Sequence, residues 1–491
     1  MTQSTQHMTY KAIIVFAATT LLLSTSQIAA GQTPPPTAKA ASTAPARTTA
    51  TPKGATPTPR NTARVTASAT LSPTQAVPTP VPFGVDAGDV TDKDAPLIEQ
   101  SAGTINILLL GTDASTDVKN ARTDSIMIAS INPDIPSVSL LSFPRDLVVR
   151  IPDVGDDRIN TVYQRGYRNK YPGGGPSFLA LTLRKNFGIQ IDHYAHIDFQ
   201  GFIKAIDRLN GVEVLAECEL HDTFPDKEVP KGKSDLDVLP GRVTLSGKQA
   251  LWFSRSRLST TDFDRARRQQ KVMRAVLKKA RDGNLLQNAI GLYADFRAHL
   301  DTDIGIGDLP ALVSIAQNLD DLQIKSRVIT YGIVNAYTSP SGASLLVRTE
   351  KTLPYIREAL TPPADNQIQV LPVVQVYNGS KRVDMEAVAA ERLNWEGFSV
   401  IKTGKTETPD QKETQIIVYT TSSKGSPVPR LAKIFNVKPK NIIAQPNPMN
   451  PAAARVVLGA NYNSCPATAT QGLDVVLAPT ATATARPTKT P

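Results

Sequence analysis

The residues of this sequence most suited to chemistry lie between Gln249 and Arg281, in the stretch QALWFSRSRLSTTDFDRARRQQKVMRAVLKKAR. This stretch holds ten basic residues and two acidic ones. In its first half, two arginines follow two apolar residues at alternate positions, and an extended strand would direct both arginines to one face beyond two buried side chains. The four positions are Leu251, Phe253, Arg255 and Arg257.

The second half of the stretch has helical spacing. Arg265 and Gln269 stand at the head of a stripe that continues in two valines, so a helix would aim both polar side chains toward the protein interior. The stripe consists of Arg265, Gln269, Val272 and Val276. A second stripe is typical of a solvated basic face and consists of Arg267, Lys271, Arg274 and Lys278.

Inward-facing guanidinium groups and an amide on a strand end and the following helix suit a multiply charged anion such as a diphosphate. The alternative is a set of surface arginines followed by a helix whose N-cap is Asp262 or Asp264. The spacing alone does not decide between the two.

Acidic residues supply the second half of a candidate site. Asp113 follows an apolar strand in the motif GTD, and Asp124 opens the next strand in the motif ARTDS. If these strands pair, the two carboxylates lie together and suit Mg²⁺, which proteins hold with one or two carboxylates plus phosphate oxygens. Arg122, and Arg145 in the motif SFPRD, would lie at the same rim.

Each of these residues alone also fits an ordinary turn or ion pair. Their combination does not favour stability, because surface ion pairs contribute little and buried ones carry a large desolvation cost. The combination does suit phosphoryl transfer, in which arginines and a metal position the transferring group and neutralise its charge.

The elements that must position these residues alternate irregularly between strands and helices. Strands are expected at 105–110, 125–132 and 136–143, and the stretch 153–175 is expected to form a loop over the site. This order predicts an α/β domain over residues 104–360, with a mixed central sheet sandwiched by helices. A second, smaller α/β domain of βαββαβ order is expected over residues 370–462, where binding or positioning is expected and not chemistry.

The ends of the chain belong to neither domain. Residues 1–30 contain an apolar run typical of an export signal, which is either cleaved or retained as a single membrane anchor, with the bulk of the protein outside the cytoplasm. Residues 31–100 are rich in Thr, Pro and Ala and predict a disordered tether, and residues 466–491 predict a disordered tail. Residues 31–84 of the tether hold five basic residues and no acidic one, which is half of the formal net charge of +10, so the charge does not predict a nucleic-acid partner.

Cys218 and Cys465 are the only cysteines. Two separate thiols are expected, although one disulfide outside the cytoplasm is an alternative.

The chain from about Gly103 to Ala280 resembles the LytR-CpsA-Psr family of bacterial cell-envelope phosphotransferases. The resemblance rests on several separated motifs in the family's order: NILLLGTD, ARTDS, LSFPRDL, RINTVYQRG, IDHYAHIDFQGF, LNGVEV, LSGKQALWFSRSR and DFDRARRQQ. The second domain, with VVQVYNGS and LNWEGFSV, resembles the LytR C-terminal domain that some members carry.

The resemblance implies that the protein moves a glycopolymer from an undecaprenyl pyrophosphate carrier to an acceptor hydroxyl of the wall, usually peptidoglycan. It assigns Asp113 and Asp124 to Mg²⁺, Asp262 to the role of base for the attacking hydroxyl, and Arg122 and Arg145 to catalysis as well as binding. The segment between Arg257 and Asp262 is shorter than in many relatives, so Asp264 remains an alternative base. The pyrophosphate would be held by Arg122, Arg145, Arg255, Arg257, Arg265 and Gln269.

Two other functions agree less well with the sequence. A non-catalytic binder of anionic wall polymer would explain the export signal and the charge, but not the inward-facing Arg265 and Gln269. Transcriptional regulation conflicts with an export signal and with the lack of a recognition-helix motif.

Overall fold

The structure is a computed structural model, and it describes residues 94–112, 121–133, 136–257, 260–283, 286, 289–361, 371–420 and 426–465. The predicted export segment, nearly all of the tether, the tail and Asp113 lie outside the described residues. Within the described part, no helix combines the length and the apolar character that crossing a membrane requires.

A six-stranded mixed sheet forms the centre of the larger domain, in the order β11-β6-β1-β2-β3-β12. The neighbours β1, β2 and β3 pair antiparallel, whereas β1 with β6 and β3 with β12 pair parallel. The expected first three strands are therefore confirmed. Their bounds are β1 (Ile105–Thr112), β2 (Thr123–Asn132), β3 (Ser137–Phe143), β6 (His193–Ile197), β11 (Leu300–Thr302) and β12 (Ile324–Val328).

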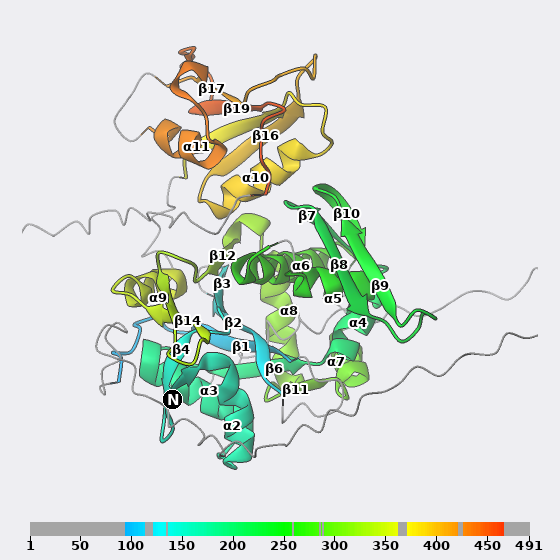
Figure 1. The fold of residues 1–491 in the computed structure, drawn as a ribbon, viewed down its shortest axis with the longest axis vertical. Coiled ribbons are helices and arrows are strands. Elements are labelled where there is room, and N and C mark those ends of the chain that lie inside the picture. Colours follow the sequence, from blue (N-terminus) through cyan, green and yellow to red (C-terminus); the bar gives the residue numbers. More distant parts are fainter. Residues whose placement is uncertain are drawn as a thin grey trace, which may run out of the picture. The chain divides into compact units, whose positions relative to one another are not determined.

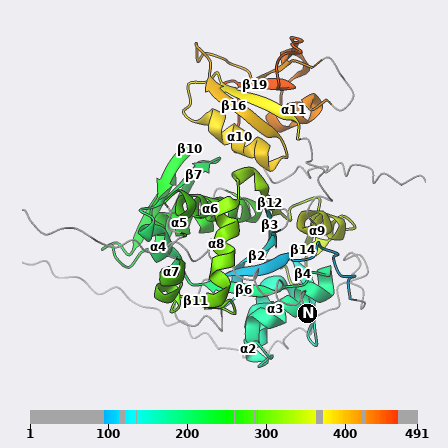
Figure 2. The same ribbon diagram turned by 180° about the vertical axis from the view of Figure 1, so that it is seen from behind.

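Side chains on the two faces of this sheet enter two different cores. Ile107 and Leu109 of β1 pack with α4, α5, α6 and α8, while Leu108 and Leu110 pack with α2, α3 and α9. Figures 1 and 2 show α2 and α3 on one side of the sheet and α6 on the other. The predicted mixed sheet sandwiched by helices is thus confirmed. The helices are α2 (Val162–Arg168), α3 (Gly174–Phe187), α4 (Phe199–Arg208), α5 (Gly247–Arg255), α6 (Asp262–Asp282), α7 (Ala289–Phe296), α8 (Leu309–Asn318) and α9 (Thr352–Leu360).

In the described part of the larger domain, four two-stranded sheets accompany the central one. The polar segment 218–239 forms the hairpin β8–β9, and the loop expected over 153–175 contains β5, α2 and the start of α3. The pairs are β4 (Val148–Ile151) with β5 (Gly155–Arg158), β7 (Val212–Ala216) with β10 (Gly241–Leu245), β8 (Leu220–Pro225) with β9 (Lys233–Val238), and β13 (Val334–Thr338) with β14 (Ser344–Arg348).

The C-terminal part has its own sheet, in the order β16-β15-β19-β17-β18, and its own core. Val374, Val376 and Val456 point to one face of this sheet, where they pack with both helices of this part. The predicted βαββαβ order gains one short strand, β18. The elements are β15 (Val373–Asn378), α10 (Met385–Trp395), β16 (Ser399–Lys405), β17 (Gln415–Val418), α11 (Val428–Phe435), β18 (Ile442–Ala444) and β19 (Ala454–Leu458).

Three sequence-based expectations were wrong. The segment that ends in Arg255 is helix α5 and not a strand. Cys218 and Cys465 form a disulfide and are not two separate thiols. The expected solvated stripe of α6 is largely covered, since Lys271 is 4% exposed and Arg274 donates to the carbonyl oxygen of Ile324.

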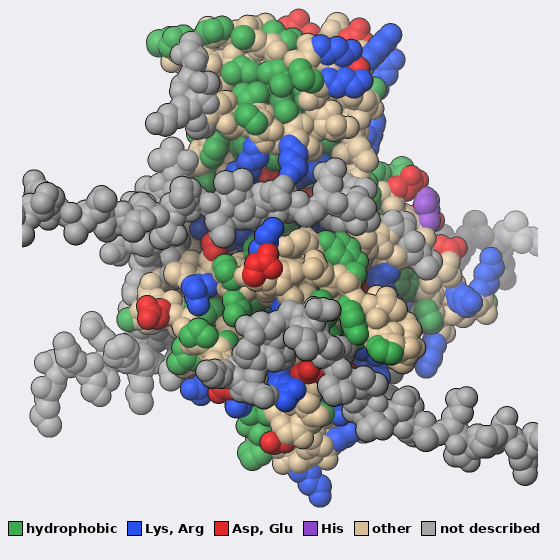
Figure 3. Space-filling view, turned by 60° about the vertical axis from the view of Figure 1, so that its left-hand side comes forward, with side chains coloured by type: hydrophobic (Ala, Val, Ile, Leu, Met, Phe, Trp, Pro, Cys, Tyr) green, Lys and Arg blue, Asp and Glu red, His purple; other side chains and the backbone are tan. Residues whose placement is uncertain are grey.

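Charged side chains of both signs share the surface. On the face shown in Figure 3, the described lysines and arginines alternate with aspartates and glutamates and do not merge into one continuous basic area.

Candidate active site

Two helices with capping boxes position the basic residues. Ser246 caps α5 through the backbone N–H of Gln249, and Thr261 caps α6 through that of Asp264, with the capping residue's own N–H bonded in return. Asp264 is therefore the capping-box partner at the start of α6. Asp262, the first residue of the helix, remains available to the site.

Arg268 ties these two helices together. Its Nε donates to the carbonyl oxygen of Phe253 at 2.8 Å, and its Nη2 donates to that of Ser256. These carbonyls lie at the end of α5, where a helix leaves carbonyl groups without partners. A buried guanidinium thus fixes the position of Arg255 and Arg257 relative to α6.

The end of α5 presents the two predicted arginines differently from an extended strand. Arg255, the last residue of α5, lies with its guanidinium carbon 4.7 Å from the centre of the Phe199 ring. Arg257 follows the helix, and its backbone N–H donates to Asp222 Oδ2 at 3.1 Å. Both side chains still reach one site, because helix α5 ends at Arg255 and Arg257 follows in a non-helical segment.

The central sheet supplies the opposite side of the site. Asp124 is the second residue of β2, and Arg145 follows β3, the antiparallel neighbour of β2. Arg145 Nη1 lies 3.2 Å from Asp124 Oδ1, and its Nε lies 3.3 Å from Asp146 Oδ2. Arg145 therefore pairs with Asp146 and with Asp124 at the same time.

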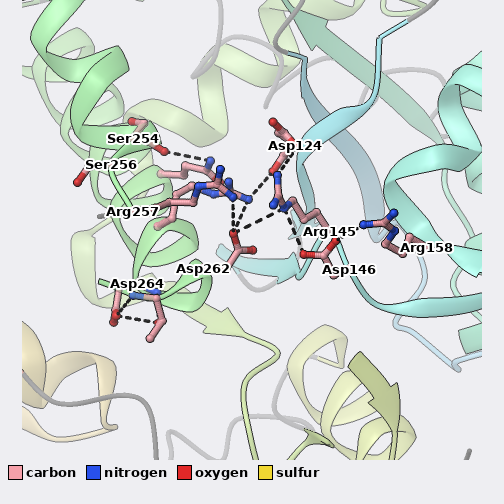
Figure 4. A network of polar contacts seen from close by, with 12 residues as sticks. Asp124, Arg145, Asp146, Arg158, Ser254, Ser256, Arg257, Asp262 and Asp264 are labelled. Carbon is pink, nitrogen blue, oxygen red and sulfur yellow. Dashed lines mark hydrogen bonds and ion pairs between the residues drawn. The ribbon is translucent and has the colours of Figure 1, made fainter. Parts of the chain in front are cut away.

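Asp262 connects the two sides (Figure 4). Its Oδ1 lies 2.9 Å from Arg265 Nη2, 3.8 Å from Arg145 Nε and 3.9 Å from Arg257 Nη1. This oxygen is buried, yet it accepts no hydrogen bond from the described residues. The three contacts are therefore ion pairs whose geometry does not meet that of a hydrogen bond. Arg265 also donates to the carbonyl oxygen of Asp124 at 3.2 Å.

Burial shifts the protonation equilibria of this cluster. It raises the pKa of Asp262 even though Arg265 and Arg145 act in the opposite direction. It lowers the pKa of Arg265 despite the nearby Asp262. For Arg145 burial also lowers the pKa, but Asp124, Asp146 and Asp262 more than offset this, and the net shift is upward.

A cavity of about 380 Å³ opens beside the charged cluster. One end is polar and includes Asp124, Arg255, Arg257, Arg265 and Gln269, while the remainder is mostly apolar. Six apolar residues of β6, α4 and α6 line this cavity, whereas Ile203 of α4 does not. The six are Ile197, Phe199, Phe202, Ile206, Val272 and Val276.

Gln269 and Asp222 belong to a longer polar lining, which also includes Thr112, Ser125, Asp198, Thr223 and Ser254. Gln269 donates to the carbonyl oxygen of Ser254 at 3.3 Å and accepts from the hydroxyl of Ser125 at 3.1 Å. Asp222 is 5% exposed, and its Oδ1 has no hydrogen-bond partner among the described residues. Sequence reasoning missed Asp222, although Leu220, Asp222 and Phe224 alternate as expected for a strand.

One predicted site residue is not part of this cluster, and another lies outside the described residues. Arg122 is exposed immediately before β2 and does not line the cavity. Asp113 lies outside the described residues, so its pairing with Asp124 stays a prediction. Among the described residues, no three or more His, Cys, Asp or Glu side chains form a group able to hold a metal.

Comparison with known proteins gives matches over both parts of the chain. The sequence model of the LytR_cpsA_psr family matches residues 83–360, and that of the LytR cell envelope-related transcriptional attenuator matches residues 372–462. Over 235 residues the chain is 31% identical to the polyisoprenyl-teichoic acid–peptidoglycan teichoic acid transferase TagU of Oceanobacillus iheyensis, an alignment that covers 48% of this chain and 69% of that protein.

Two further relatives are more distant or align over a shorter length. The regulatory protein MsrR of Staphylococcus aureus strain COL is 34% identical over 180 residues, which are 36% of this chain and 49% of that protein. The crystal structure of TagV from Bacillus subtilis aligns with a TM-score of 0.45 and 22% identity over 53% of this chain and 98% of that one. Because the first family model covers more than half of the sequence, this protein belongs to the LytR_cpsA_psr family.

Proposed function

We propose that this protein transfers a glycopolymer, such as a teichoic acid, from a polyprenyl diphosphate carrier to a hydroxyl group of peptidoglycan. The observation that carries the proposal is the environment of Asp262. Its buried Oδ1 lies among three guanidinium groups, beside a cavity whose lining is mostly apolar. The TagU relative is named for a transfer of this kind.

The arginines would bind the diphosphate. Arg145, Arg257 and Arg265 approach one point from three different segments, and Arg255 and Gln269 line the adjoining cavity. Guanidinium groups form strong charge-assisted hydrogen bonds with phosphate oxygens. The apolar part of the cavity would receive the first isoprene units of the carrier.

Asp262 would act as the base. The acceptor hydroxyl donates its proton to Asp262 while its oxygen attacks the phosphorus that carries the sugar. A new P–O bond forms, the bond to the bridging oxygen breaks, and the polyprenyl monophosphate leaves with the electron pair. A carboxylate oxygen that is buried and accepts no hydrogen bond suits this role, and its raised pKa makes it a stronger base.

Mg²⁺ is a further part of the proposal. Asp124 offers a carboxylate at the polar end of the cavity, with a side chain 35% exposed, and Asp113 is the second proposed ligand. This donor set fits Mg²⁺, which needs only one or two carboxylates when phosphate oxygens supply the rest. Bound there, the ion would neutralise charge on the diphosphate.

The proposed location is the outer side of the cell membrane, with residues 1–30 as the anchor or as a cleaved signal. A carrier embedded in the membrane would then be within reach of the domain through the tether.

The test is transfer by the purified full-length protein in detergent, with an undecaprenyl-diphosphate-linked oligosaccharide as donor and a peptidoglycan fragment as acceptor. The joined product, measured by mass spectrometry, is expected for the wild type and for Arg150→Ala, which alters an arginine that is 49% exposed and pairs with Asp156. Arg145→Ala is expected to stay folded and to form no product. Full transfer by Arg145→Ala would refute the site, and donor binding without transfer by the wild type would favour a non-catalytic binder.

A further inference from the structure

Helix α6 carries a buried ion cluster on the side away from the site. Lys271 is 4% exposed, and its Nζ lies 3.2 Å from Glu217 Oε1 and also contacts Glu391 Oε2. The same Nζ donates to the carbonyl oxygen of Leu215 at 3.0 Å and lies 5.8 Å from the centre of the Trp395 ring. A lysine of the larger domain therefore has two glutamate partners, one of them on α10 of the C-terminal part.

Lys271 lies close to the site residues along the helix but faces elsewhere. It follows Gln269 by two residues, which turns it by about 200° around the helix axis. Gln269 lines the cavity, so Lys271 is held on the nearly opposite face of α6 at the same height. Contacts made by Lys271 thus restrain the turn of helix that presents Gln269 and, one turn earlier, Arg265.

Both parts of the chain contribute charges to this cluster. Burial raises the pKa of Glu217, but Lys271 and Arg267 more than offset this, and the net shift is downward. Burial lowers the pKa of Lys271, but Glu217 and Glu391 offset that, and the net shift is upward. Each group is therefore held in its charged form, and loss of one partner would leave a buried charge less well compensated.

A covalent bond lies beside this cluster. Cys218 follows Glu217 directly and forms a disulfide with Cys465, which comes after the last strand of the C-terminal part. Leu215, two residues before Glu217, packs against the core of that part. The backbone N–H of Arg242 in β10 also donates to Asp384 Oδ2, at 3.3 Å.

We propose that the C-terminal domain is a brace for the substrate-binding helix. Glu391 acts through Lys271, and the Cys218–Cys465 disulfide keeps Glu391 in place, so that α6 holds Arg265 and Gln269 in position for the diphosphate. Glu391 and Lys271 are positioning residues, since neither reaches the cavity. This inference rests on the proposed function for its substrate, but the contacts that carry it lie outside the site.

The test compares full-length variants in two measurements. Glu391→Gln removes the charge, and the double variant Cys218→Ser/Cys465→Ser removes the disulfide without leaving a free thiol. The control is Asp282→Asn, which removes the carboxylate partner of the exposed Lys278 on the same helix. One measurement is hydrogen–deuterium exchange of the amides of α6, and the other is the steady-state kinetics of transfer from the undecaprenyl-diphosphate-linked donor.

Both brace variants are expected to exchange faster than the wild type over residues 265–275 and to raise the KM for the donor by about 2- to 30-fold, with kcat little changed. Asp282→Asn should match the wild type in both measurements. Unchanged exchange and KM in both brace variants would overturn the brace. A wild type that neither binds nor transfers the donor would refute the proposed function instead, and the exchange of α6 would still decide whether the C-terminal domain restrains it.

Discussion

Asp262 and Arg265 form an ion pair of 2.9 Å within the first turn of α6, and the same carboxylate oxygen is shared with Arg145 and Arg257. One carboxylate thus opposes three guanidinium groups that reach it from three segments of the chain. Arg145 also pairs with Asp124 and Asp146, whereas Arg257 and Arg265 share Asp262, and a bound diphosphate would accept hydrogen bonds from these guanidinium groups.

Replacing Asp262 with Asn should abolish most of the transfer without unfolding the protein. Loss of a general base lowers kcat by roughly 10²–10⁴-fold. The free energy of unfolding should stay equal or rise, because burial of the carboxylate opposes folding, as its raised pKa shows. Transfer kinetics and thermal unfolding measure the two effects, and a variant with wild-type kcat would exclude Asp262 as the base.

Asp264→Asn provides the matched control for this substitution. Asp264 Oδ2 accepts from the backbone N–H and the hydroxyl of Thr261, and the amide oxygen of Asn can accept the same N–H, so the substitution should cost no more than about 1 kcal/mol of stability. Transfer by the remaining folded protein should persist. If Asp264→Asn lost transfer while Asp262→Asn kept it, the roles of the two aspartates would be reversed.

The pH dependence of transfer should reflect the raised pKa of Asp262. The base works only when ionised, so kcat/KM should fall as the pH drops through a value above the usual 3.8 of an aspartate. The free energy of unfolding changes in the opposite direction to the activity. Burial favours the protonated form of Asp262, so its contribution to stability is fully present below the pKa of the unfolded chain and is lost as the pH rises through the pKa of the folded protein. Asp262→Asn should therefore gain stability relative to the wild type as the pH increases, and a constant difference across this range would argue against the shift.

Arg265→Ala should weaken diphosphate binding. Hydrogen bonds to charged groups contribute enough that the dissociation constant should rise about 10- to 100-fold. Calorimetric titration with geranylgeranyl diphosphate measures this, with Lys278→Ala as a control because Lys278 lies on the same helix and is 55% exposed. Equal weakening by both substitutions would indicate a general charge effect and not a specific site.

Val276→Phe should separate binding of the isoprene chain from binding of the phosphates. Val276 lines the apolar part of the cavity, whereas Ile203 of α4 does not, so Ile203→Phe is the control. The larger ring should lower the affinity for geranylgeranyl diphosphate and leave that for inorganic diphosphate unchanged. Competition binding with both ligands would show this, and an equal loss for both would place the chain elsewhere.

Part of the site follows from the sequence because the signals are local. Arg265 and Gln269 are four residues apart on a long helix with a clear apolar stripe, and the structure places both at the cavity. The helix over residues 249–255 was not predicted, because the alternating apolar residues of segment 249–257 match a strand, while the capping pair Ser246 and Gln249 begins a helix. In this segment the helix-capping residues decide the secondary structure, and the alternation of apolar residues does not.

Other features depend on distant partners and could not be predicted. The sequence predicts a solvated Lys271, because its partners Glu217 and Glu391 lie in other parts of the chain and contact it only in the folded protein. The two cysteines are separated by 247 residues, so only the fold brings them together. The same holds for the cavity, whose apolar walls cannot be distinguished from core by spacing alone.

The most direct test of the central claim is mass spectrometry of the lipid that copurifies with the full-length protein from its membrane fraction. A cavity that joins apolar walls to Arg265 predicts that a polyprenyl phosphate or diphosphate is retained by the wild type and depleted in both Arg265→Ala and Val276→Phe. Equal amounts of such lipid in all three proteins, or none in the wild type after the carrier is supplied, would contradict the account.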